Sequence, residues 1–382
     1  MKKIFLGCLI LLLTGCYDYK ELNTISLVSA TYVDYYKDNY VITAEVINPQ
    51  APDKEVVIQS PFIIYSGTGK TIQEAYRNIA MNTSRFLYSN HLQLMLLSKN
   101  ITSKNLEEII DFYSRNPSIR TEFYVLTVIN DDPLSIITPI DEFSSSSIVD
   151  TVNTNKKYLG TTKAFTFNDL LNSYLNPNIE ISIPAIKIIN NTVDKDNLSN
   201  TNESKVKTMY EINGMGVFKD NNLVGYLDYD ETITFNYLNN DIDNSIITYK
   251  CGDDRYATLE VVDNKTSINF LNNTFNISFK ISSNINDSSC NINYSKNYEL
   301  SKFKNDVTNY FNNYIENNIR NIIKKYDSDI FGFLDFIYKY NYDEYLKYKD
   351  NFNLNNIKFK INANIDIVSN GNIIGGLNEK DK

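Results

Sequence analysis

The sequence predicts an α+β fold with several domains, in which antiparallel or mixed β-sheets are flanked by helices. Within residues 25–129, strand-like alternation of apolar and polar residues is interleaved with helical spacing. Residues 209–282 are mostly strand-like, and a long helical pattern over residues 302–326 follows them. The 382 residues are also enough to bury two or three hydrophobic cores.

Strands and helices alternate along the first half of the chain. Strand patterns cover residues 25–33, 40–47, 91–97 and 121–129, and residues 56–65 include further extended sequence. Thr71 and Glu74 form a capping box that predicts the start of a helix. Ser103 is expected to cap a second helix, and residues 167–174 predict a third. The predicted inner face of the second helix consists of Leu106, Ile109, Ile110 and Tyr113.

The second half begins with strands and ends with helices and one more strand. Strands are expected at residues 209–219, 223–227, 231–237, 246–250, 257–262 and 274–282, with a hairpin turn at residues 220–222. Apolar residues recur at helical spacing over 302–326, and a shorter helix is expected at 329–340. Residues 357–367 alternate strictly between apolar and polar side chains, which is typical of a half-buried strand.

These patterns divide the chain into five predicted parts. Residues 1–15 are expected to be a cleaved signal peptide, and residues 16–24 a lipidated cysteine with its tether. An N-terminal α+β region with room for two domains covers 25–189. Residues 190–206 are rich in Asn, Asp, Ser, Thr and Lys and predict a linker. A C-terminal α+β domain with the helix 302–326 covers residues 207–382.

The N-terminus has the features of a bacterial lipoprotein signal. Lys2 and Lys3 precede an apolar run of about ten residues, which is the usual length in a signal peptide. As a helix this run would reach only about 15 Å, half of a hydrocarbon core of about 30 Å. It ends in Leu13-Thr14-Gly15-Cys16, the pattern after which a cysteine receives a diacylglyceryl group. An ordinary signal peptide with an incidental cysteine is the alternative. Two acyl chains suffice for stable anchoring in a bilayer.

Charge and cysteine content exclude some functions and leave others open. The formal net charge is −9, and removal of residues 1–15 would take away two lysines and no acid. An acidic chain without a basic tract is a poor nucleic-acid binder. It is also not drawn to anionic headgroups, so lipid on Cys16 would have to provide the anchoring. An exported location permits a disulfide between Cys251 and Cys290, and two unpaired thiols are the alternative.

No motif in the sequence indicates an enzyme, a cofactor or a metal. Residues 67–71 resemble the end of a phosphate-binding loop, but that pattern requires glycine where Ile64 stands, so we interpret them as a tight turn with a helix cap. His91 is the only histidine, and no nucleophile elbow or CxxC motif accompanies it. We expect His91 to lie in a core or an interface. Glu74 and Glu231 attract attention as carboxylates, but the sequence does not show whether they are paired.

Four segments together resemble the Ger(x)C family of spore germination lipoproteins. They are Leu13 to Asp18 with Glu21-Leu22-Asn23; Gly69 to Ala75 with Arg85 to Tyr88 and His91-Leu92; Gly214 to Lys219 with Leu223 to Leu227 and Glu231-Thr232; and Phe331-Gly332. Their order covers nearly the whole chain. The family usually has Trp after the lipid cysteine and in the C-terminal helical region, whereas Tyr17 stands at the first position and the chain has no Trp.

The resemblance implies a fold, a location and partners. It implies three domains of antiparallel sheets flanked by helices, on the outer face of the spore inner membrane. It also implies a role as the C subunit of a GerA-type nutrient germinant receptor, beside a polytopic A subunit and a transporter-like B subunit. It does not imply an enzyme, and it leaves open whether this subunit binds the nutrient.

Two functions of other classes compete with this interpretation. A substrate-binding lipoprotein of a transporter would usually show two lobes of repeated β–α alternation, and the strand-rich residues 209–282 argue against it. An exported hydrolase would have to use His91 as its base and lacks a recognisable second catalytic group. The sequence therefore favours a lipid-anchored subunit that acts through protein–protein contacts.

Overall fold

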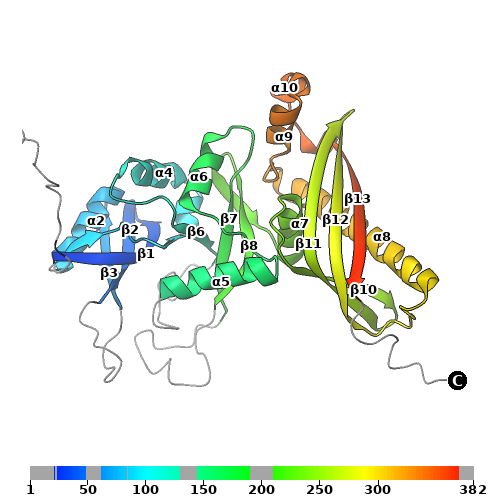
Figure 1. Cartoon of the computed structure of the whole chain (residues 1–382). Helices are drawn as coiled ribbons and strands as arrows, with labels where there is room; N and C mark the ends of the chain where they lie inside the picture. The colour runs from blue at the N-terminus through cyan, green and yellow to red at the C-terminus, as the bar shows by residue number, and fades with distance from the viewer. Residues whose placement is uncertain are drawn as a thin grey trace, which may run out of the picture.

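The computed structural model of the chain describes residues 21, 24–48, 62–83, 85–129, 144–189 and 210–369. The expected signal peptide 1–15, Cys16 and the expected linker 190–206 lie outside these residues. Figure 1 shows two bodies side by side, the first containing β1 to β9 and the second containing β10 to β13.

In the described part of the chain, a mixed nine-stranded sheet forms the centre of the first body, in the order β3-β2-β1-β5-β6-β7-β8-β9 with β4 beside β1. Parallel pairs join β1 to β4 and β5, β5 to β6, and β6 to β7, and the remaining pairs are antiparallel. The strands are β1 (Ile25–Tyr36), β2 (Asn39–Ile47), β3 (Phe62–Gly69), β4 (Phe86–Tyr88), β5 (Leu94–Leu97), β6 (Tyr124–Val128), β7 (Ser182–Ile188), β8 (Tyr210–Lys219) and β9 (Asn222–Tyr226).

Helices cover both faces of this sheet. One apolar cluster joins the sheet to α2, α4 and α6, and a separate cluster on other sheet residues includes Ile148 and Val152 of α5. The helices are α2 (Ile72–Ile79), α3 (Lys99–Thr102), α4 (Leu106–Arg115), α5 (Ser144–Tyr158) and α6 (Phe167–Leu175), with a short 3₁₀ turn η2 (Ala80–Asn82) after α2. The buried side chains of α4 are the four that the helical spacing predicted.

The second body consists of a four-stranded sheet and helices packed against it (Figure 1). Strands β10, β11 and β12 are antiparallel neighbours, and β13 adds in parallel to β12. The elements are α7 (Tyr229–Leu238), β10 (Ser245–Gly252), β11 (Arg255–Leu271), β12 (Thr274–Ser288), α8 (Asn297–Tyr326), α9 (Phe333–Tyr340), α10 (Tyr342–Tyr348), η4 (Leu354–Asn356) and β13 (Lys358–Ser369).

Periodicity predicted α8 and β13 well because each has one buried and one solvated face. The buried residues of α8 include Phe303, Val307, Phe311, Ile315 and Ile319. On β13 the apolar residues from Phe359 to Ile367 face the core or are half-buried, and the intervening lysines and asparagines are exposed. The tyrosine-rich α8 is therefore a core helix.

One predicted strand and one predicted helix cap in particular are wrong. Residues 231–237 are not a strand but lie within α7, in which every residue from Glu231 to Leu238 is buried. A helix that is buried all round has no polar stripe, so its sequence carries no helical period. Ser103 is the C-cap of α3, whose N-cap is Ser98, and α4 begins after Asn105 without a side-chain cap.

The expected linker falls between two strands of the first body and not between the two bodies. Strand β7 precedes residues 190–206 and β8 follows them, and the two strands pair antiparallel in one sheet. The chain passes from the first sheet to the second body between β9 and α7, which the sequence does not mark with a polar stretch. The division into domains therefore stays a prediction.

Candidate functional site

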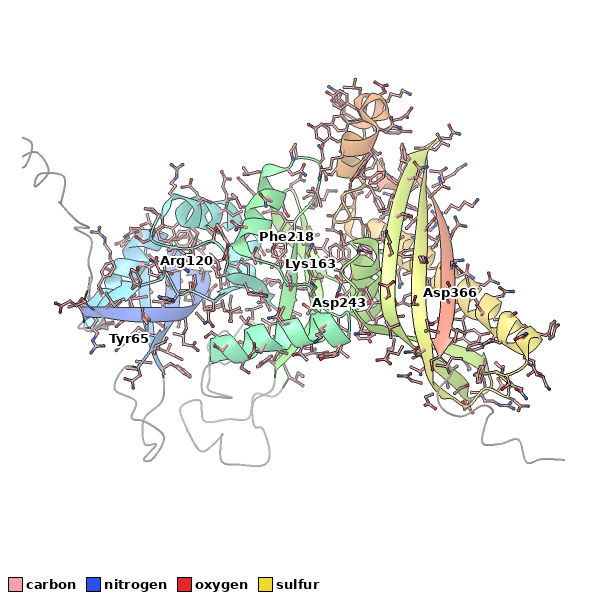
Figure 2. All side chains as sticks on the ribbon, in the orientation of Figure 1. Tyr65, Arg120, Lys163, Phe218, Asp243 and Asp366 are labelled. Carbon is pink, nitrogen blue, oxygen red and sulfur yellow. A yellow bond between two sulfur atoms is a disulfide. The ribbon has the colours of Figure 1, made fainter. Side chains whose placement is uncertain are left out.

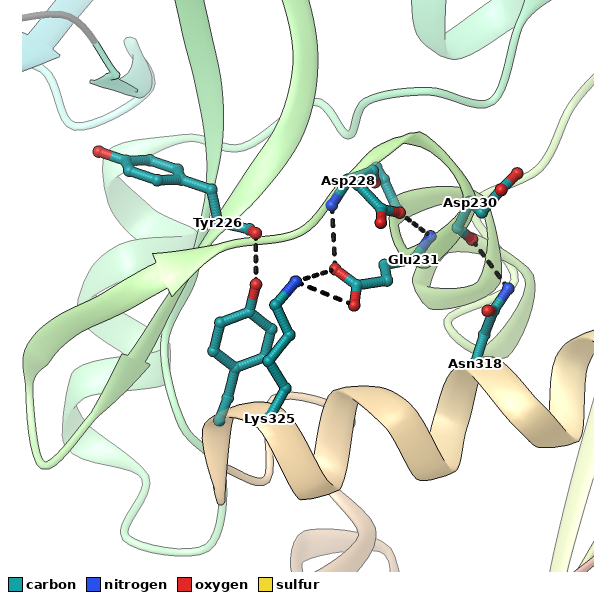
Figure 3. A network of polar contacts seen from close by, with 8 residues as sticks. Tyr226, Asp228, Asp230, Glu231, Asn318 and Lys325 are labelled. Atoms are coloured by element: carbon teal, nitrogen blue, oxygen red, sulfur yellow. Dashed lines mark hydrogen bonds and ion pairs between the residues drawn. The ribbon is translucent and has the colours of Figure 1, made fainter.

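A polar network around the buried carboxylate of Glu231 lies where the two bodies meet. Figure 3 shows β9 leaving the first sheet and leading into α7, next to the last turn of α8. Asp228 is the N-cap of α7, and its carboxylate accepts a hydrogen bond from the Glu231 N–H at 2.9 Å. The Glu231 carboxylate in turn accepts the Asp228 N–H at 3.0 Å. This reciprocal capping box fixes the start of α7.

Glu231 also joins α7 to α8. Lys325 Nζ lies 3.1 Å from both carboxylate oxygens of Glu231, whose side chain is only 7% exposed. Burial lowers the pKa of Lys325, but hydrogen bonds with Tyr326 and Glu231 outweigh it and hold the pKa above its usual value. Because an enclosed carboxylate without a cation is costly, this pair fixes the two helices relative to each other.

The last residue of α8 and the residues after it contact the first sheet. The Tyr326 hydroxyl donates to the carbonyl of Tyr226 at the end of β9. A Cβ at Gly225 would lie 2.5 Å from Cε1 of Tyr326, so glycine allows the ring to lie against the strand. Ser328 Oγ donates to the Phe218 carbonyl on β8 at 2.5 Å. Figure 2 places Phe218 and Lys163 on the side of the first body that faces the second.

Two carboxyl groups at this junction have raised pKa values. Burial raises the pKa of Asp329 to about 7, and hydrogen bonds from the N–H groups of Leu334 and Phe333 oppose that rise. Burial also raises the pKa of Glu180, against the hydrogen bond from the Asp220 N–H, which lowers it. Both shifts predict that the stability of the junction depends on pH.

The junction brings together the second-half segments that carried the family resemblance. Residues 214–219 and 223–227 supply β8 and β9, and Glu231 supplies the pair with Lys325. Gly332 adopts a left-handed φ of 71° at the start of α9 and lies against Ile179 of the first body. One apolar cluster includes Met215 and Val217 of β8 with the core of the second body, so the two bodies share a hydrophobic core.

A second feature is an open groove of about 1240 Å³ in the first body. Its lining comes from α2, from α4, from residues 86–89 and from the loop 116–119. Tyr76 of α2 stacks on Phe112 of α4 with ring centroids 5.7 Å apart. The hydroxyl groups of Tyr76 and Tyr113 lie 2.8 Å apart, which fixes the Tyr76 ring.

The glycines of the phosphate-loop-like segment have a packing role beside this groove. A Cβ at Gly67 would lie 2.3 Å from the Ala75 carbonyl oxygen, and one at Gly69 would lie 2.5 Å from the Ala75 nitrogen. Glycine thus allows β3 to lie directly against α2. Thr71 accepts the Glu74 N–H at 3.1 Å, and Glu74 accepts the Lys70 N–H at 2.7 Å, so a strand end followed by a helix cap forms here.

Comparisons with known proteins cover both bodies. Residues 18–188 match the family described as "Spore germination protein N-terminal domain", and residues 213–371 match the family described as "Spore germination B3/ GerAC like, C-terminal". The chain belongs to the Ger(x)C family of spore germination proteins. The two matches together span both sheets and the junction between them.

Individual relatives agree with this assignment. Spore germination protein KC of Bacillus subtilis is 26% identical over 292 residues, which is 70% of each chain. Spore germination protein B3 of the same organism is 24% identical over 238 residues, 60% of this chain and 59% of that protein. The crystal structure of the GerBC protein matches with a TM-score of 0.56 and 19% identity, over 88% of this chain and 96% of that one, and so supports the Ger(x)C fold.

The structure places the other residues singled out in the sequence apart from one another. His91 is exposed in the turn before β5, so it lies neither on the predicted strand nor in a core, and the alternative that it lies in an interface stays a prediction. Cys251 at the end of β10 and Cys290 after β12 form a disulfide, with Cα atoms 6.0 Å apart. Glu74 and Glu231 cap different helices and are not a pair. Cys16 lies outside the described residues.

Two other features are absent from the part of the chain that the structure describes. No cluster of three or more His, Cys, Asp or Glu side chains is arranged to hold a metal ion there. Over the same residues no helix is both long and apolar enough to cross a membrane. The junction and the groove are the candidate sites in the described part of this Ger(x)C protein.

Proposed function

We propose that this chain is a lipid-anchored subunit of a spore nutrient germinant receptor. The observation that carries the proposal is the pair of germination-family matches, which together extend from residue 18 to residue 371. The matched relatives are named as spore germination proteins, and this supports germination over substrate capture for a transporter.

The anchor in this proposal is a diacylglyceryl group on Cys16, after cleavage of residues 1–15. It holds the protein at the outer face of the spore inner membrane, beside the A and B subunits of the receptor. Confinement to the membrane plane raises the effective concentration of the protein near membrane-embedded partners, so weak contacts become sufficient.

The protein acts in this proposal by contact and not by catalysis. The buried charged groups of the junction cap helices or join elements of the chain itself, as Glu231 and Asp329 do. Such groups stabilise the two-body arrangement. The junction thus presents both bodies to the partner subunits as one unit.

Deletion of the gene tests the receptor role. Spores that lack this chain should fail to germinate with the nutrients that its receptor recognises, and should respond normally to a trigger that bypasses nutrient receptors. A plasmid copy of the wild-type gene should restore the nutrient response. Normal germination of the deletion spores with every nutrient to which wild-type spores respond would refute the proposal.

A further inference from the structure

The groove between α2 and α4 has walls of opposite charge. Lys70 and Arg77 line it on the α2 side. Glu107, Glu108 and Asp111 line it on the α4 side, where Arg115 pairs with Asp111 at 2.6 Å and leaves Glu107 and Glu108 as the excess negative charge. These acids lie on the exposed face of α4, whose apolar face is buried in the core. A ligand that carries both charges could therefore be oriented across the groove.

The floor and rim of the groove are aromatic. Tyr76 and Phe112 form a stacked pair, and the hydrogen bond between Tyr76 and Tyr113 holds that pair in place. Phe86 on the rim leaves 61% of its surface exposed, and Tyr88 follows it on the same short strand. Rigid aromatic surfaces with a polar rim are typical of the centre of a protein–protein contact.

The groove lies close to the point at which the chain leads toward the predicted anchor. Ile25 at the start of β1 pairs with Phe86 of the groove rim. Only nine residue steps separate Ile25 from Cys16, and an extended chain covers at most about 3.3–3.6 Å per step, or about 30 Å. With lipid on Cys16 the rim residue Phe86 therefore stays within a few nanometres of the bilayer surface.

We propose that this groove is the docking site for a short segment of a membrane-embedded receptor subunit. That segment carries an apolar or aromatic residue that contacts Tyr76 and Phe112, basic residues that face α4, and an acidic residue that faces Lys70 and Arg77. Charge complementarity orients the segment, and the aromatic floor provides the affinity. The inference rests on the proposed receptor function.

Charge reversal on the α4 wall tests the docking. The full chain would carry Glu107→Lys with Glu108→Lys, and the matched control would carry Asp263→Lys with Asp287→Lys, two exposed acids of the second sheet. The readout is the amount of epitope-tagged A and B subunits that purifies with the chain from detergent-solubilised spore inner membrane. We expect at least a tenfold loss for the groove variant and none for the control. Equal recovery from both variants would overturn the proposal.

Cross-linking provides a measurement that leaves the charges intact. With Cys16 lipidated and Cys251 bound to Cys290, an introduced cysteine is the only free thiol of the mature chain. Gln73→Cys places a photo-crosslinker on the groove, and Tyr298→Cys places it on α8 at a residue that is 80% exposed. We expect an adduct with the tagged A or B subunit from Gln73→Cys alone. No such adduct, an adduct with lipid or a second copy instead, or equal adducts from both positions would contradict the inference.

The deletion experiment distinguishes failure of the docking proposal from failure of the proposed receptor function. If deletion spores germinate normally, the proposed function fails and the groove loses its partner. If deletion abolishes nutrient germination but the α4 variant still purifies with both subunits and germinates normally, the function stands and only the docking site is wrong.

Discussion

At the scale of single residues, the most consequential side chain is Glu231. It closes the capping box of α7 and pairs with Lys325 of α8 while only 7% of its side chain is exposed. An exposed ion pair of the same length would contribute little, because water competes for both partners. Here the Glu231 carboxylate is enclosed between two helices while the Lys325 side chain is 49% exposed, so the pair matters because it compensates a buried negative charge.

Glu231→Ala should therefore destabilise the protein by about 1–3 kcal/mol, since it leaves the Asp228 N–H and Lys325 without their acceptor. The free energy of unfolding from urea titration checks this. Glu316→Ala is the control, because Glu316 pairs with Arg320 on the exposed face of α8, and it should cost about 0.5 kcal/mol or less. Equal losses for the two variants would contradict the account of the junction.

Asp329 predicts a pH dependence of stability. The pKa of its carboxyl is about 7 in the folded protein against 3.8 ordinarily, so between these values the folded state holds a proton that the unfolded chain has released. Stability from this group is therefore highest below pH 3.8 and falls as the pH rises toward 7. Asp329→Asn should flatten this dependence. The test compares thermal unfolding midpoints at pH 5 and pH 8, and an unchanged difference between them would refute the assignment to Asp329.

At the scale of elements, close approach of β3 and α2 depends on glycine. Gly67→Ala should cost about 1–3 kcal/mol, because the new methyl group meets the Ala75 carbonyl and α2 must shift. Gly252→Ala on β10 is a matched control, since no heavy atom lies within 4 Å of its added Cβ. Denaturant titration of both variants measures the difference. Similar stability of the two variants would argue against this packing.

The disulfide gives a second prediction for an element. Cys251 and Cys290 lie 39 residues apart in sequence and connect the end of β10 to the segment before α8. Replacement of both by serine should lower the free energy of unfolding by about 2–4 kcal/mol, chiefly because the unfolded chain gains conformational entropy. Urea titration measures this loss. Alkylation of the unreduced protein followed by mass spectrometry checks the bond itself, and two reactive thiols would contradict it.

Elements with one solvated face could be predicted from the sequence, and others could not. The spacing of apolar residues in α4, α8 and β13 indicated both the element and its buried face. The hairpin turn at residues 220–222 was predictable because Asp and Asn tolerate the left-handed backbone that tight turns require. Asp220 and Asn221 adopt left-handed φ angles of 50° and 63° there. Helix α7 was missed because its apolar and β-branched residues, buried on every side, carry no helical period.

Arrangements that depend on contacts between distant parts of the chain could not be predicted from the sequence either. The sequence predicted a strand from residue 91 to residue 97, whereas β5 begins only at Leu94 and leaves His91 in the preceding turn. Nothing local indicates that β8 pairs with β7 across residues 190–206, or that α2 and α4 enclose a groove. The capping pattern at Asp228 and Glu231 was the one signal in the sequence that could have revealed α7.

At the scale of the whole molecule, two sheets are joined into one unit. The shared apolar cluster and the polar network fasten the second body to β8 and β9. A groove of mixed charge lies on the first body, next to the strand that follows the predicted tether. This arrangement suits a protein that is held at a membrane and that acts through contacts with neighbouring subunits.

The most direct test of this account is germination of spores that carry Cys16→Ala, scored with nutrients and with a trigger that bypasses nutrient receptors. The account predicts that the protein leaves the membrane fraction, that the nutrient response is lost, and that the bypass response is normal. Release of the protein from the membrane with an unchanged nutrient response would show that membrane confinement is not how it acts, and would contradict the central claim.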